Sequence, residues 1–173
     1  MYKKGSYIIK NLNGVCKVED IVQLEGAGMD KNKKYYYLRP VNEHSGKLYV
    51  SVDNAENLTR RVMTEEEVWQ LIDQIPEIEE IWIDNEKQRE LRYKEALKSR
   101  DPRMLVGIIK MLYLRRKKRM EQGKKSTSTD EKYFKMAEDI LYSEIGFVLG
   151  KEKKEVGELI TEFINKKAME GQV

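Results

Sequence analysis

The lysines and arginines of this chain have the clearest chemistry, because they are concentrated in one block. Residues 84–135 contain 17 Lys/Arg and 8 Asp/Glu, whereas residues 64–83 contain seven acids and no base. The formal net charge of only +3 hides this separation. A basic block on folded helices is the electrostatic footprint of a surface that binds a polyanion. Charge runs are often merely solvated helix faces, so the block indicates a binding surface only if further motifs support it.

Catalytic and metal-binding chemistry has little support. Cys16 is the single cysteine and His44 the single histidine, and they lie far apart in sequence. They form no His/Cys zinc site, and we expect a small buried thiol and a loop histidine rather than a catalytic pair. Gly26 and Gly28 are not followed by a helix-opening pattern, so they indicate a turn and not a phosphate loop. We therefore expect a protein that is not an enzyme and needs no cofactor or metal.

Length and composition indicate one ordinary domain or two small ones in 173 residues. No run of about 18 apolar residues is present, so we expect no membrane-spanning segment. The first ten residues lack the apolar region and cleavage site of a secretory signal. A lone cysteine is typical of a reducing compartment. These features predict a cytoplasmic protein, and we expect a monomer.

The first third of the chain has the pattern of short strands. Runs rich in Val, Ile, Tyr and Leu alternate with turn-forming groups such as Asn11-Leu12-Asn13-Gly14, with no helical period between them. Such closely spaced strands predict a small curled antiparallel sheet with exposed edges, which are natural places for a partner strand to pair. The expected strands cover Ser6–Lys10, Val15–Leu24, Lys34–Arg39 and Lys47–Val52.

From Thr64 onward the period of the apolar residues becomes helical. Thr64 and Glu67 resemble a capping box, Asp101-Pro102 resembles an N-cap followed by proline at N1, and Ser128 with Glu131 resembles a further cap. The expected helices run from Thr64 to Pro76, from Asn85 to Ser99, from Asp101 to Arg119, from Ser128 to Gly150 and from Glu152 to Lys167. The whole pattern predicts an α+β protein, with an SH3/Tudor-like antiparallel β-barrel over residues 1–62 and an all-α helical bundle over residues 63–173.

Specific residues in both halves of the chain resemble those of a known protein family. In order and spacing the chain resembles the CarD/CdnL transcription regulators of bacteria, whose barrel is shared with the RNA polymerase-interacting domain of the transcription-repair coupling factor. The resemblance covers nearly the whole chain. The matching pieces are Gly14-Val15, Tyr36-Tyr37-Leu38-Arg39-Pro40, Val50-Ser51-Val52-Asp53-Asn54-Ala55, Arg92-Tyr93-Lys94, Leu97-Lys98-Ser99-Arg100-Asp101, Leu112-Tyr113 and the segment from Ser128 to Leu149.

This resemblance implies a regulator without catalysis. Its Tudor-like domain would dock on the β subunit of RNA polymerase by edge-strand pairing, with Gln23, Leu24 and Tyr49 as the polymerase-binding residues. Its helical domain would contact double-stranded promoter DNA near the upstream edge of the −10 region and stabilise the open complex. Well-studied members carry a tryptophan wedge four residues before the tyrosine of the Arg-Tyr-Lys motif. Arg89 occupies that position here, and we expect Trp82 to pack in the bundle.

The expected DNA-binding residues are Arg89, Arg92, Lys94 and Lys132. Arg89 and Arg92 are i,i+3 neighbours on one helix, and Lys132 lies in the first turn of another, beside amides suited to phosphate. The denser run from Arg115 to Arg119 is the rival site, although its place at a helix C-terminus already complements the helix dipole.

Two other classes of function stay open at this point. A stand-alone RNA- or ribosome-associated protein would also combine a small barrel with basic helices, although consecutive Tyr35, Tyr36 and Tyr37 alternate between faces and cannot form one stacking platform. A protein-only adaptor would have basic helices that are merely solvated.

Overall fold

A computed structural model describes residues 1–26, 30–42 and 46–171 of the chain. The chain divides into two compact units, Met1–Val62 and Met63–Val173, which we describe separately. We refer to them as the sheet unit and the helical unit. Gly28 and His44, to which the sequence assigned turn and loop roles, lie outside the described residues.

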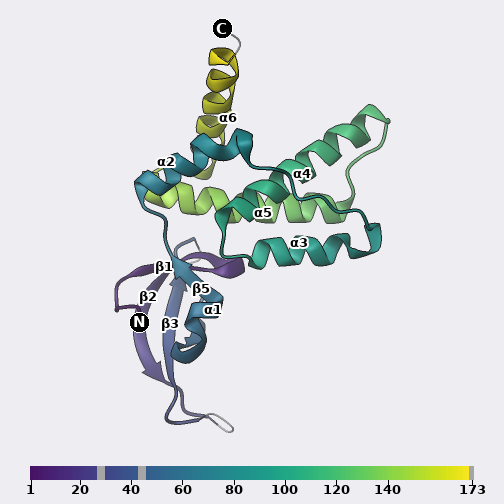
Figure 1. Cartoon of the computed structure of the whole chain (residues 1–173). Helices are drawn as coiled ribbons and strands as arrows, with labels where there is room; N and C mark the ends of the chain where they lie inside the picture. The colour runs from purple at the N-terminus through teal and green to yellow at the C-terminus, as the bar shows by residue number, and fades with distance from the viewer. Residues whose placement is uncertain (27–29, 43–45, 172–173) are drawn as a thin grey trace. The chain divides into compact units, whose positions relative to one another are not determined.

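The sheet unit contains a five-stranded antiparallel sheet in the order β4-β3-β2-β1-β5 (Figure 1). Gly14 begins β2 with a φ of 68°, a conformation that glycine adopts without the steric cost of a Cβ atom. The register of β2 on β3 shifts between Val18 and Asp20, which marks a bulge. The strands are β1 (Tyr7–Lys10), β2 (Gly14–Gln23), β3 (Lys34–Pro40), β4 (Leu48–Ser51) and β5 (Thr59–Arg61).

The connection between β4 and β5 differs from the expectation that no helix interrupts the strands. It contains the 3-10 turn η2 (Val52–Asn54) and the short helix α1 (Ala55–Leu58), and η1 (Asn11–Asn13) links β1 to β2. Four residues are too few to show a helical period, which is why the sequence pattern missed α1. Among the described strands no pairing joins β4 to β5, so closure of the sheet into a barrel stays a prediction.

One face of the sheet forms a small apolar core because side chains alternate along each strand. Tyr36 and Leu38 of β3 are buried, whereas their neighbours Tyr35 and Tyr37 are half-buried on the other face. Cys16 is fully buried, as expected for a small apolar thiol. The buried cluster consists of Ile8, Cys16, Val18, Tyr36, Leu38, Val50 and Ala55.

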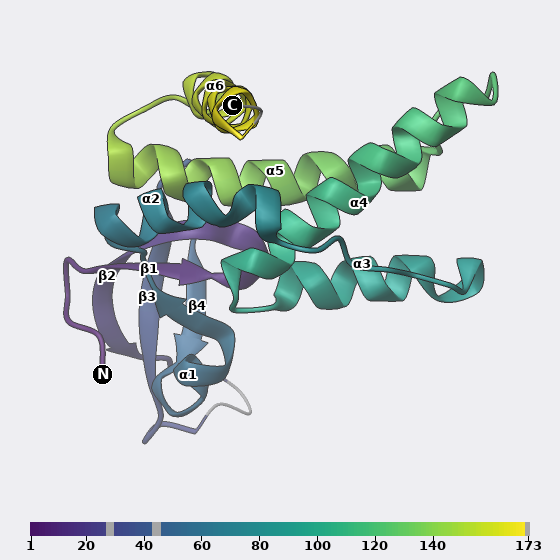
Figure 2. The same cartoon turned by 45° about the horizontal axis from the view of Figure 1, so that its top comes forward.

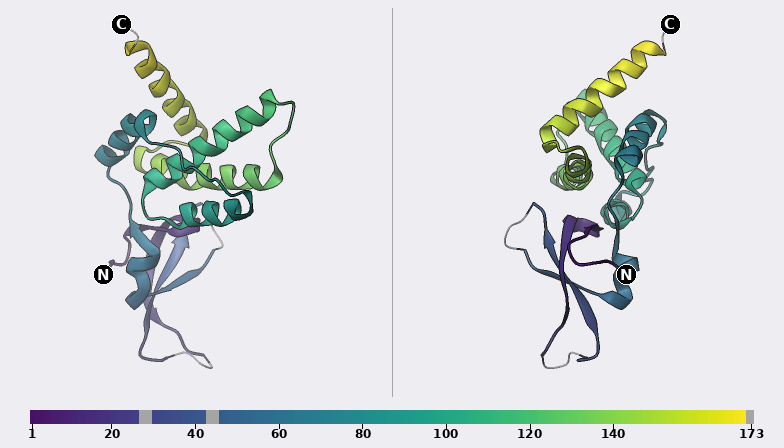
Figure 3. Two further views of the ribbon diagram at one scale, coloured as in Figure 1. Left: turned by 45° about the vertical axis from the view of Figure 1, so that its right-hand side comes forward. Right: turned by 90° about the vertical axis from the view of Figure 1, so that its left-hand side faces the viewer.

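The helical unit packs five helices around a second apolar core (Figure 2). The core draws on α2, α3, α4, α5 and α6, and its members recur at the three- and four-residue spacing of an amphipathic helix. Figure 3 shows that α6 crosses α5 rather than running along it. The helices are α2 (Glu65–Gln74), α3 (Arg89–Lys98), α4 (Pro102–Glu121), α5 (Ser128–Leu149) and α6 (Lys153–Glu170), with 3-10 turns η3 (Ile75–Glu77) and η4 (Glu86–Gln88).

The helix starts follow the capping rules, with one shift. The Thr64 hydroxyl accepts the Glu67 N–H at 3.2 Å, and the Glu67 carboxylate accepts the Thr64 N–H at 2.8 Å. Asp101 caps α4 ahead of Pro102 as expected. The expected cap of α5 at Ser128 is wrong by one residue, because Thr127 accepts the Asp130 N–H and is the N-cap. The run Ser126 to Thr129 offers a capping hydroxyl at every position, so composition alone could not choose among them.

The turn after α5 requires a glycine inside the helix. The Lys151 N–H donates to the Gly146 carbonyl oxygen at 2.8 Å, and Gly150 adopts the left-handed conformation that closes the helix. A Cβ atom added at Gly146 would clash with the Lys151 carbonyl oxygen. The close approach of the α5–α6 turn therefore depends on a missing side chain. Among the described helices, none is long and apolar enough to cross a membrane.

Candidate functional site: the sheet edge and the basic helical surface

The β4 strand is a free edge of the sheet. Among the described strands it pairs only with β3, with Tyr49 opposite Tyr37. An edge strand presents unpaired backbone groups to a partner strand. The Tyr49 side chain is exposed and stacks on Tyr37, with ring centroids 5.5 Å apart. The predicted polymerase-binding residue Tyr49 thus lies on an edge that is able to accept another strand.

Gln23 and Leu24 do not share that edge. Gln23 ends β2 and pairs with Lys34 of β3, so it lies on the strand at the opposite side of β3 from Tyr49. The described ladder of β1 on β2 ends at Lys17, which leaves the far end of β2 beyond the reach of β1. Leu24 follows the strand and is half-buried. A single partner strand therefore cannot pair with both predicted positions.

Two further residues accompany Tyr49 on the outer face of the sheet. Alternation places Tyr37 and Arg39 on the same face of β3, and Arg39 Nε lies 3.6 Å from a carboxylate oxygen of Glu19. The interaction with Tyr37 and the charge of Glu19 raise the pKa of Arg39 above its ordinary value. Tyr37 and Arg39 belong to a segment that resembles the family, and the two-residue period of a strand could have identified them as surface neighbours of Tyr49.

In the helical unit, Arg89 is held inside the fold. Its side chain is only 12% exposed and pairs with Glu86 at 2.9 Å, and one guanidinium nitrogen donates to the Ile83 carbonyl oxygen at 3.4 Å. These contacts hold the Arg89 guanidinium against Glu86 and the Ile83 carbonyl oxygen. The DNA contact predicted for Arg89 stays untested, but its side chain has a structural role.

The other predicted DNA-binding residues are exposed, and two of them are paired within α3. Arg92 pairs with Glu95 at 3.0 Å and Lys94 with Glu90 at 3.2 Å, both over half exposed. Lys132 lies in the first turn of α5, with its Nζ 5.4 Å from the Tyr133 ring centroid. Such exposed pairs are weak, about 0.3–0.5 kcal/mol, so phosphate could displace them. They nevertheless lower the net positive charge of α3.

The rival run from Arg115 to Arg119 divides into inward and outward residues. Arg115 donates to the buried Asp130 at 2.7 Å and lies 3.0 Å from Glu86. Arg116 pairs with Glu131 at 2.7 Å, and its guanidinium carbon lies 4.4 Å above the Phe134 ring. The sequence could not reveal these pairs, because the acids come from α5 and η4 and approach α4 only in the folded helical unit. Lys117 and Lys118 are exposed.

Trp82 contradicts the expectation that it packs in the bundle. It is 76% exposed, and its indole nitrogen is hydrogen-bonded to Asp84. It lies outside a regular helix, between α2 and α3, where Glu79 and Glu80 are also exposed. The apolar spacing of this segment therefore did not predict whether Trp82 is buried.

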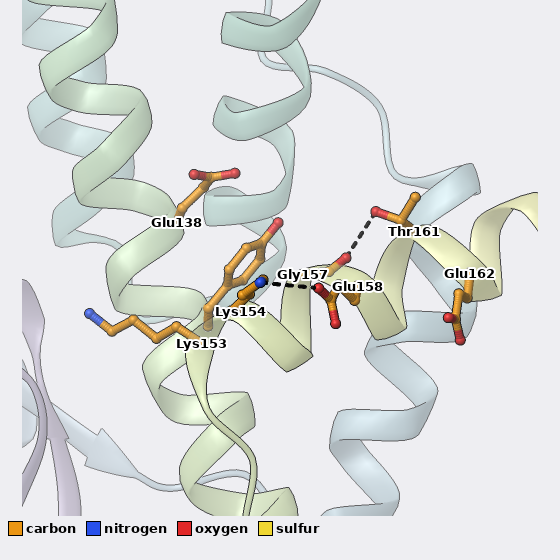
Figure 4. Close-up of a pocket in the computed structure, with 8 residues that line it drawn as sticks. Glu138, Lys153, Lys154, Gly157, Glu158, Thr161 and Glu162 are labelled. Atoms are coloured by element: carbon orange, nitrogen blue, oxygen red, sulfur yellow. Dashed lines mark hydrogen bonds and ion pairs between the residues drawn. The ribbon is translucent and has the colours of Figure 1, made fainter.

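A pocket between α5 and α6 has a volume of about 510 Å³ and is lined by side chains of both charge signs (Figure 4). Lys153 lies 3.2 Å from Asp139, and Lys154 lies 4.0 Å from Glu158. Burial raises the pKa of Glu138, and it raises the pKa of Tyr142 to about 12. Because the charges offset one another, this pocket adds nothing to a polyanion-binding surface.

The N-terminal part of the chain matches a known protein family. Residues 2–63 match the model of the CarD-like/TRCF RID domain, where RID denotes the RNA polymerase-interacting domain. The match covers the sheet unit. A search of curated proteins found no match for the chain. Residues 2–63 are therefore similar to the CarD-like/TRCF RID domain, which supports a CarD-like family and suggests interaction with RNA polymerase and a part in transcription regulation.

Proposed function

We propose that this protein is a transcription regulator that binds the β subunit of RNA polymerase with its sheet unit and contacts double-stranded promoter DNA with its helical unit. In this proposal it stabilises the open complex near the upstream edge of the −10 region, acts without catalysis, and works in the cytoplasm as a monomer on the polymerase. The observation that carries the proposal is the match of residues 2–63 to the RID family, together with a free β4 edge within those residues.

The polymerase contact is proposed at the β4 edge rather than at the end of β2. The whole length of β4 is an outer strand, whereas β1 already covers part of β2. Tyr49 and Tyr37 add an aromatic surface beside the backbone groups. Main-chain hydrogen bonds supply affinity in strand addition, and neighbouring side chains supply specificity.

The DNA contact is proposed to rest on charge rather than on an apolar wedge. Trp82 is the exposed tryptophan near α3, but Glu79, Glu80 and Asp84 surround it in sequence and oppose a phosphate backbone. Arg89, at the wedge position of the family, packs inward. Contacts to phosphates position a protein on DNA and carry no base preference, so we expect binding with little sequence dependence.

Stand-alone RNA binding receives less support from the sheet unit. Tyr36 is buried, as alternation required, so it offers no ring to a base. Tyr37 and Tyr49 stack on each other with an angle of 24° between their planes, which occupies one face of each ring and leaves less ring surface for base stacking.

The lifetime of promoter open complexes tests this proposal. Adding the full-length protein to polymerase already bound at a promoter should lengthen the half-life of open complexes after challenge with a polyanionic competitor. Because tethering to polymerase raises the local concentration of the helical unit towards the millimolar range, weak DNA contacts become effective there. Unchanged lifetimes at saturating protein would contradict the role in open-complex stability.

A further inference from the structure

The end of α4 and the following turn form a strongly basic stretch of the helical unit. Residues 114–126 contain seven Lys/Arg and a single acid, Glu121. In Figures 1 and 2 this end of α4 points away from α2 and α6. We refer to residues 114–126 as the basic tip.

Four lysines of the basic tip keep their charge available. Arg115 and Arg116 are engaged with Asp130 and Glu131 of α5. The four lysines of the basic tip are Lys117, Lys118, Lys124 and Lys125. All four are exposed, and none of them forms an ion pair with any residue in the described part of the chain. The predicted α3 cations differ, because Arg92 and Lys94 each have an acid partner on their own helix.

Backbone hydrogen bonds hold the turn against the last turn of α4. The Lys124 N–H donates to the Arg119 carbonyl oxygen at 2.8 Å, and the Gly123 N–H donates to the Met120 carbonyl oxygen at 2.9 Å. With Gly123 at a φ of 70°, this is the Schellman arrangement of a helix end. The Arg119 guanidinium also donates to the Lys125 carbonyl oxygen at 2.9 Å. The lysines of the helix and of the turn are therefore presented together on an ordered element.

This concentration of charge has only a partial structural explanation. Lys118 and Arg119 complement the dipole at the C-terminus of α4, but Lys124 and Lys125 lie beyond the helix and repel the others. Because the backbone that carries these cations is already ordered, binding of a polyanion costs less conformational entropy. Duplex DNA carries about one negative charge per 1.7 Å of helix axis, so it offers several closely spaced phosphates to a cluster of cations. Residues 114–126 contain no aromatic side chain for stacking single-stranded bases.

We propose that the basic tip is the main phosphate-contact surface of the helical unit, and that it binds the backbone of duplex DNA without sequence preference. This inference rests on the DNA contact of the proposed function and locates it on the α4–α5 turn instead of on α3. Lysine suits this role because its ammonium is a compact point charge that contacts phosphate without demanding a planar partner.

Matched removal of four charges tests the assignment in the full-length protein. The tip variant carries Lys117→Gln, Lys118→Gln, Lys124→Gln and Lys125→Gln. The comparison variant, called the α3 variant, carries Arg92→Gln, Lys94→Gln and Lys98→Gln of α3 together with Lys132→Gln of α5. Binding to a short labelled duplex of mixed sequence is measured over a range of salt concentrations. If all four tip lysines contact phosphate, the slope of log K against log salt should flatten by roughly 3.6, with a loss of affinity on the order of 10–100-fold at low salt. The α3 variant should keep most of the wild-type slope.

A gain of affinity gives a second, independent test. Glu121→Gln removes the one acid of the basic tip, so duplex binding should become about twofold or more tighter at low salt. Misfolding cannot produce such a gain. If the α3 variant loses duplex binding while the tip variant matches the wild type, the inference is wrong although the proposed function stands. If the wild-type protein does not bind duplex DNA even at low salt, both the inference and the DNA contact of the proposed function are wrong.

Discussion

Asp130→Ala should lower the free energy of unfolding of the helical unit by about 3 kcal/mol, because it breaks a largely buried ion pair and leaves the buried Tyr93 hydroxyl without its acceptor. Asp130 is only 5% exposed, and its carboxylate accepts hydrogen bonds from Tyr93 Oη and from Arg115 Nε, both at 2.7 Å. It therefore joins α3, α4 and α5. Chemical denaturation followed by circular dichroism measures the change.

Glu131→Ala is the matched control for this prediction. Glu131 is the next residue of the same helix turn and also pairs with an arginine, Arg116, but its side chain is 47% exposed. Exposed pairs contribute about 0–1 kcal/mol, so the control should change little. Equal losses in the two variants would show that burial of Asp130 does not determine its contribution.

The same carboxylate should make the helical unit sensitive to acid. Burial raises the pKa of Asp130, but the hydrogen bonds from Arg115 and Tyr93 outweigh this effect and hold the pKa below its ordinary value. Because the pKa is lower in the folded state, the carboxylate stabilises the fold above the unfolded pKa of about 3.9 and loses this contribution as the pH falls through the folded value. In the Asp130→Ala protein this part of the acid dependence should be absent.

Tyr49→Pro should weaken binding of the full-length protein to RNA polymerase by about 10-fold or more, equivalent to about 1.4 kcal/mol or more. Proline removes a backbone donor from the β4 edge, and the substitution also deletes the ring that stacks on Tyr37. Tyr49→Ala separates the two effects, because it deletes the ring and keeps the donor. The circular dichroism spectrum of each variant establishes that the sheet is retained.

Gln23→Pro is the control for the choice of edge. Gln23 lies on β2, at the other side of β3 from Tyr49, and a partner strand on β4 does not reach it. We expect Gln23→Pro to retain polymerase binding. Loss of binding in Gln23→Pro alone would move the docking edge to β2, and retained binding in both folded proline variants would show that strand pairing is not the mode of attachment.

The secondary structure was largely predictable because its determinants are local. The two-residue period identified β1 to β4, and the caps at Thr64 and Asp101 identified the starts of α2 and α4. The four-residue helix α1 was not predictable, since a single turn has no period.

The environment of the charged and aromatic surface residues was much less predictable. Arg89 and Arg92 have the same local pattern, yet Arg89 packs against Glu86 and Ile83 while Arg92 is exposed. Arg115 meets Asp130 only after α4 and α5 have packed together. Trp82 is exposed although Ile81 and Ile83 flank it in sequence. These differences arise from tertiary contacts, which the spacing of residues on one helix does not encode.

Capture of bound cellular complexes by the tagged full-length protein tests the central claim most directly. After salt washing, the retained material is identified and its stoichiometry to the protein is measured. The account predicts RNA polymerase in a one-to-one complex, retained by the wild-type protein and reduced with Tyr49→Pro. Retention of ribosomal particles instead, or failure of purified polymerase to bind the folded wild-type protein, would contradict the assignment as a polymerase-bound regulator.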